Sequence, residues 1–135
     1  MLKNHRIGLL GLIAVFAMAV SILPANAAMM GKASTMPTFK NGVLVDQHDM
    51  TLYVFSKDTA GTSNCYGKCA TLWPPLLAPS DATASGHFSI ITRKDGAKQW
   101  AYNGQPLYLF AHDTSAGQEK GNGFKGLWKV VKAPM

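Results

Sequence analysis

One phrase of this sequence occurs twice, and it constrains the fold more than any other feature. Residues 52–59 read LYVFSKDT, and residues 107–114, which lie 55 positions later, read LYLFAHDT. At the same offset, Leu72-Trp73 returns as Leu127-Trp128. Self-similarity at a fixed period indicates a repeated structural unit. The chain is therefore expected to contain two copies of one unit.

The amino terminus has the pattern of an export signal. Basic residues precede an apolar run over residues 7–20, and Ala25-Asn26-Ala27 supplies the small residues that signal peptidase selects. The apolar run is too short for a convincing membrane anchor. We expect residues 1–27 to be removed and the mature protein to be periplasmic or secreted, with residues 28–36 forming a flexible leader.

The remainder alternates strand-forming runs with turn dipeptides, as expected for an all-β domain. Asn-Gly and Asp-Gly pairs separate several runs, which is the strongest short-range hairpin signal. We predict one domain over residues 37–135, with a first repeat at 37–77, a linker at 78–86 and a second repeat at 87–132. Each repeat is expected to be a β-meander, the two packed with approximate two-fold symmetry, and a short helical turn is expected near residues 65–72.

The repeated phrase can be explained by folding alone. In a strand, Tyr53 and Phe55 share one face and Leu52 and Val54 the other, so both faces are apolar and the strand is central. Buried tyrosines need hydrogen-bond partners, and an aspartate after a strand can hold its turn. Trp73 is expected to pack over the aromatic pair. Asp58 is expected to hold the turn after the first phrase. In the second copy, the same roles are expected of Tyr108, Phe110, Asp113 and Trp128.

These residues, taken together, resemble a known family. The doubled Tyr-x-aromatic-x-x-Asp phrase, with Cys-x-x-x-Cys-Ala-x-x-Trp-Pro-Pro-Leu after its first copy, is similar to bacterial secreted-repeat proteins. These are described as predicted lipoproteins with a conserved YX(FWY)XXD motif. The resemblance covers about residues 42–131 and implies an extracytoplasmic location and a repeated fold, with no molecular function assigned. No cysteine stands near the predicted cleavage site, so a lipid anchor is not expected.

The only two cysteines, Cys65 and Cys69, occur in the first copy alone. An exported protein meets oxidising conditions, and two cysteines one helical turn apart are close enough for a disulfide. The alternative is a thiol site for copper, with His48, His87 or His112 as a further ligand. A redox-active pair is a third interpretation. We expect a structural disulfide and no cofactor.

No catalytic motif is found in the sequence. Asp58 and Asp113 could form a carboxylate pair for glycoside hydrolysis, but two turn-holding aspartates explain them more simply. Lysines are scattered singly, which argues against a nucleic-acid surface. We therefore expect a non-catalytic envelope protein, structural or binding, with a possible envelope or cell-wall partner. The alternatives are a copper or thiol protein using the CxxxC loop and, more distantly, a hydrolase.

Overall fold

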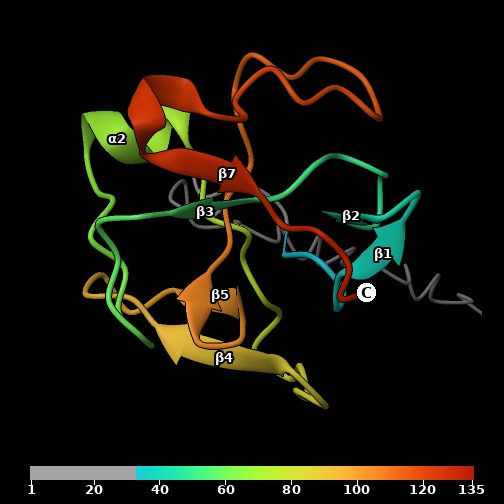
Figure 1. The fold of residues 1–135 in the computed structure, drawn as a ribbon. Helices are drawn as coiled ribbons and strands as arrows, with labels where there is room; N and C mark the ends of the chain where they lie inside the picture. The colour runs from blue at the N-terminus through green and yellow to red at the C-terminus, as the bar shows by residue number, and fades with distance from the viewer. Residues whose placement is uncertain (1–32) are drawn as a thin grey trace, which may run out of the picture.

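The computed structural model describes residues 33–135, and the predicted signal lies outside them. The elements are short strands with one short helix, α2, and one 3-10 turn, η1 (Figure 1). Their bounds are β1 Thr38–Lys40, β2 Val43–Val45, β3 Tyr53–Phe55, α2 Lys68–Leu72, β4 Phe88–Thr92, β5 Lys98–Tyr102, β6 Gln105–Pro106, η1 Phe124–Gly126 and β7 Trp128–Val130. The predicted all-β class with a helical turn after the first phrase is confirmed.

Each repeat begins with an antiparallel hairpin. β1 pairs with β2 in the first repeat, and β4, β5 and β6 form a meander in the second. The turns Asn41-Gly42 and Asn103-Gly104 both have positive φ at their two central residues, 52° and 80° in one and 48° and 78° in the other. Asparagine and glycine tolerate this conformation, which matches the twist of the flanking strands. The Asn-Gly pairs therefore fix the β1–β2 and β5–β6 hairpins.

The closing segment of each repeat pairs with the other repeat. β7, at the end of the second repeat, pairs with β3 of the first (Figure 1). In the same way, the segment 74–78 of the first repeat pairs with residues of the second: Leu76 N donates to Leu107 O at 2.9 Å, and Trp100 N donates to Leu76 O at 2.9 Å. The last segment of each predicted repeat therefore hydrogen-bonds to the strands of the other repeat.

The repeated segments bury side chains in a hydrophobic cluster on each of their two faces. Leu52 and Leu107 are fully buried in one hydrophobic cluster, with Trp100 and Leu44. Tyr53 and Tyr108 are fully buried in a second cluster. The prediction of a central strand with two apolar faces is confirmed, because neither face of the phrase is left in water.

The packed structure begins earlier than the sequence suggests. Ser34, which we expected in a flexible leader, is 3% exposed. Its N–H donates to Leu77 O at 2.7 Å, and its carbonyl accepts the indole N–H of Trp100 at 2.8 Å. Trp100 is fully buried and needs an acceptor for that N–H. Ser34 therefore belongs to the fold, whereas residues 28–32 lie outside the described part of the chain.

Candidate functional site

The aspartate of each repeat binds the tyrosine of the other. The Tyr53 hydroxyl donates to Asp113 Oδ2 at 2.6 Å, and the Tyr108 hydroxyl donates to Asp58 Oδ2 at 2.7 Å. The second oxygen of each carboxylate accepts a backbone N–H further along its own loop, from Asn64 at 2.7 Å and from Lys120 at 3.0 Å. We expected the aspartates to hold the turns that follow their strands. They also join the two repeats.

These buried pairs have shifted pKa values. Burial, reinforced by the hydrogen bond to the aspartate, raises the pKa of both the Tyr53 and the Tyr108 hydroxyls well above the usual range. Burial also raises the pKa of the Asp58 carboxyl, although hydrogen bonds from Tyr108 and Asn64 oppose the shift. Both tyrosines therefore stay protonated and act as hydrogen-bond donors at neutral pH.

The aromatic residues of the two phrases form one continuous stack. Trp73 and Trp128 lie face to face with ring centroids 3.8 Å apart and an angle of 4° between their planes. Phe110 stacks on the outer face of Trp73 at 4.2 Å, and Phe55 stacks on Trp128 at 4.3 Å. Each tryptophan thus packs on the phenylalanine of the other repeat. Stacked and edge-to-face contacts of this kind stabilise the fold beyond the area they bury.

Cys65 and Cys69 form a disulfide, as predicted. Their Cα atoms are 5.2 Å apart, and Cys65 is fully buried. Because both sulfur atoms are used in this bond, neither is a thiolate ligand in the oxidised protein. Among residues 33–135, no group of three or more His, Cys, Asp or Glu side chains is placed to hold a metal ion.

Sequence reasoning missed Arg93, the central residue of a buried polar network. Its guanidinium Nη1 donates to Ser63 Oγ at 2.9 Å and to Gln99 Oε1 at 2.8 Å, and its Nη2 donates to the Cys65 carbonyl at 2.7 Å. Ser63 Oγ is also 2.6 Å from the Tyr108 hydroxyl. One signal was available, since Arg93 is the only arginine after the predicted signal peptide.

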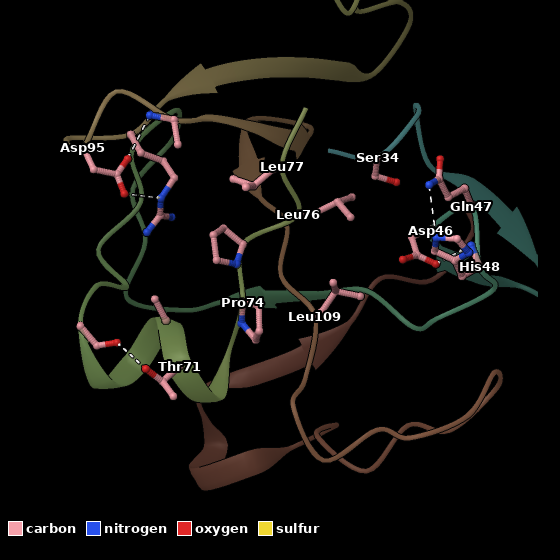
Figure 2. A pocket seen from close by; sticks show the side chains of 15 residues that line it. Ser34, Asp46, Gln47, His48, Thr71, Pro74, Leu76, Leu77, Asp95 and Leu109 are labelled. Carbon is pink, nitrogen blue, oxygen red and sulfur yellow. Dashed lines mark hydrogen bonds and ion pairs between the residues drawn. The ribbon is translucent and has the colours of Figure 1, made fainter. Parts of the chain in front are cut away.

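A cleft of about 700 Å³ lies beside this network. The segment from Pro74 to Leu77 crosses its centre together with Leu109, so the lining is mostly apolar (Figure 2). Asp95 lies at one end, and Ser34, Asp46 and His48 lie at the other (Figure 2). Arg93 belongs to the Asp95 end, because its Nε is 3.8 Å from Asp95 Oδ2. Ligand sites in proteins are typically apolar cavities of this size with a few polar groups.

Two polar atoms in the cleft wall lack partners. In the described chain, the buried side-chain nitrogen and oxygen atoms without a hydrogen bond are Ser34 Oγ and Arg93 Nε. Both residues are more than nine-tenths buried, and both line this cleft. Unsatisfied buried polar groups are unfavourable and rare in folded proteins. The two residues that carry such atoms line the same cleft.

The residues predicted from the repeated phrase lie in the core and not in the cleft. They form the Tyr–Asp pairs and the ring stack: Tyr53, Phe55, Asp58, Trp73, Tyr108, Phe110, Asp113 and Trp128. The loop unique to the first copy does reach the cleft, because Gly67, Ala70 and Thr71 line it. Of the three histidines considered as metal ligands, His48 lines the cleft.

Taken together, the fold defines a small all-β module built from two interlocked repeats. Comparison with known families gives the same class: the family described as a secreted repeat of unknown function matches residues 37–77 and 89–132, together more than half of the chain. The chain belongs to this secreted-repeat family. No curated protein and no solved structure shows a significant match. Within residues 33–135, no helix is long and apolar enough to cross a membrane.

Proposed function

We propose that this protein is a non-catalytic binding module of the bacterial envelope that holds a small ligand in the cleft between Arg93 and Ser34. One observation supports it above all: the two residues that carry the unpartnered buried polar atoms are 59 positions apart in the sequence and line the same cleft. Buried polar atoms without a partner are rare in folded proteins, and a bound polar group is one explanation for them. The proposal needs no metal or cofactor.

The contrast between the duplicated core and the cleft supports this function. The symmetric Tyr–Asp pairs and ring stack form a scaffold, whereas the cleft lining, apart from Leu109, lies outside the duplicated phrase. In the second copy, Lys129-Val130-Val131-Lys132 stands where the first has Pro74-Pro75-Leu76-Leu77. A binding site is expected to be supported by rigid elements. We propose a periplasmic or secreted location, which agrees with the description of the family as secreted.

A neutral fluorescent probe, N-phenyl-1-naphthylamine, tests the cleft directly. The mature protein should bind it saturably, with one site per chain. Thr71→Trp places a large ring at the exposed edge of the cleft and should weaken binding at least tenfold. Lys68→Trp adds the same ring to the same helix at a position outside the cleft lining and serves as the matched control. Equal binding by both variants, or no saturable binding at all, would contradict the proposal.

A further inference from the structure

The Arg93 guanidinium has hydrogen-bonding capacity that the described chain leaves unused. A guanidinium carries five N–H groups. Three of them are donated to Ser63, Gln99 and the Cys65 carbonyl. The Nε–H and one N–H of Nη2 remain, and the Nε atom is buried without a hydrogen bond. Adjacent N–H groups of arginine match the two oxygens of a carboxylate.

The nearest acidic side chain does not satisfy this group. Asp95 Oδ2 lies 3.8 Å from Arg93 Nε, which is too far for a hydrogen bond, and its side chain is 47% exposed. The other oxygen of Asp95 accepts the Ala97 N–H at 3.0 Å and holds the hairpin turn. Asp95 therefore screens the Arg93 charge loosely from the solvent side without accepting a hydrogen bond from Nε.

The two ends of the cleft carry different charges, and this difference orients a charged ligand. Lys94 Nζ lies 5.7 Å from the centroid of the Tyr66 ring, and the Arg93 guanidinium carbon lies 4.4 Å from the same centroid. Two cations therefore gather near the single carboxylate of Asp95, which leaves this end positively charged. At the other end is the buried Asp46 carboxylate, whose Oδ1 accepts the N–H groups of His48 and Met50. An anionic group is therefore favoured at the Arg93 end and disfavoured at the Asp46 end.

From these observations we infer that the cleft binds an amphipathic carboxylate. Its carboxylate accepts the Nε–H of Arg93, and its apolar body lies along the segment from Pro74 to Leu77 and against Leu109. A hydroxyl or carbonyl at the far end of the ligand would satisfy Ser34 Oγ. This inference rests on the proposed function and adds the chemical class of the ligand.

Isothermal titration calorimetry with three eight-carbon probes tests the chemical class of the ligand. Octanoate should bind at least tenfold more tightly than octylammonium and more tightly than octanamide. Asp95→Asn keeps the oxygen that accepts the Ala97 N–H but removes the competing charge, so it should tighten octanoate binding threefold or more without disturbing the core. Asp81→Asn makes the same charge change at an exposed residue outside the cleft and should have no effect.

The outcomes separate the two proposals. Binding of the neutral naphthylamine probe without any preference for octanoate, or octanoate affinity unchanged in Asp95→Asn, overturns the carboxylate inference and leaves the binding module intact. A protein that binds none of these probes overturns both. Arg93→Lys provides a further check in folded material, since lysine keeps the charge but loses the planar pair of donors and should weaken octanoate more than octanamide.

Discussion

Tyr53 and Tyr108 bond to each other through both of their backbone groups. Tyr53 N donates to Tyr108 O at 2.9 Å, and Tyr108 N donates to Tyr53 O at 3.0 Å. This reciprocal pair lies where the two repeats meet, and each tyrosine hydroxyl reaches the aspartate of the opposite repeat. The local contacts of the repeated phrase are thus contacts between repeats.

The first prediction concerns these tyrosine–aspartate hydrogen bonds between the repeats. Tyr53→Phe and Tyr108→Phe should each lower the free energy of unfolding by about 1–3 kcal/mol, because each leaves a buried carboxylate oxygen without its donor. In double-mutant cycles measured by urea unfolding, Tyr53→Phe should couple to Asp113→Asn by about 0.5–3 kcal/mol. Its coupling to Asp58→Asn, within its own repeat, should be smaller. Equal coupling to both aspartates would contradict the crossed arrangement.

A second prediction concerns Gly121, which lies against the ring stack. A Cβ at this position would be 2.5 Å from Trp73 Cη2 and 3.0 Å from Phe110 Cγ. Gly121→Ala should therefore destabilise the protein by about 1–3 kcal/mol through overpacking and alter its near-ultraviolet circular dichroism. Gly126→Ala is the control: its backbone has positive φ but open space around it, so stability should fall while the aromatic signal stays unchanged.

The disulfide should make a modest contribution to stability. Closing a five-residue loop contributes about 2 kcal/mol in the chain-entropy model. Reduction, or the double substitution Cys65→Ala and Cys69→Ala, should lower the free energy of unfolding by about that amount and leave the far-ultraviolet spectrum native. Complete unfolding on reduction would show that the fold depends on this bond far more than the size of its loop indicates.

Stability should depend on pH through Asp58. Burial raises the folded-state pKa of Asp58, so the folded protein binds this proton more tightly than the unfolded chain does. The resulting stabilisation is complete below the unfolded pKa and is lost as the pH rises through the folded pKa. The free energy of unfolding of the wild type, relative to Asp58→Asn, should therefore fall between about pH 3 and pH 7. If the free energy of unfolding of the wild type, relative to Asp58→Asn, instead rose over this range, a raised folded-state pKa of Asp58 would be contradicted.

Intact-mass measurement of exported protein tests the processing of the chain. We expect a mature form that begins at Ala28, with a mass two hydrogens below that of the dithiol form. Treatment with a reductant should add those two hydrogens back. A mass that includes residues 1–27, or that does not change on reduction, would contradict the predicted cleavage or the disulfide respectively.

The sequence predicted the features that depend on local chemistry and on the repeat. The Asn-Gly hairpins follow from backbone preferences of neighbouring residues, and the pairing of Cys65 with Cys69 follows from their spacing. The two apolar faces of the phrase follow from its alternation. These features require no knowledge of which segments meet across the fold.

The cleft and the crossed pairs could not be predicted in this way. Arg93 meets Ser63 and the Cys65 carbonyl only because the second hairpin folds against the loop of the first repeat. Ser34 becomes part of the fold through Trp100, 66 residues away. Contacts between residues so far apart leave no periodic pattern in a single sequence. The pairing of each repeat's closing segment with the other repeat leaves no such pattern either.

The pairing between repeats also changes how the YX(FWY)XXD motif should be understood. Its tyrosine and aspartate are five positions apart in each copy, yet each is bonded to the matching residue of the other copy. We therefore expect Tyr53 to vary together with Asp113 among relatives, and Tyr108 together with Asp58. Where relatives have lost the motif aspartate in one copy, the tyrosine that should drift to phenylalanine is the one in the opposite copy.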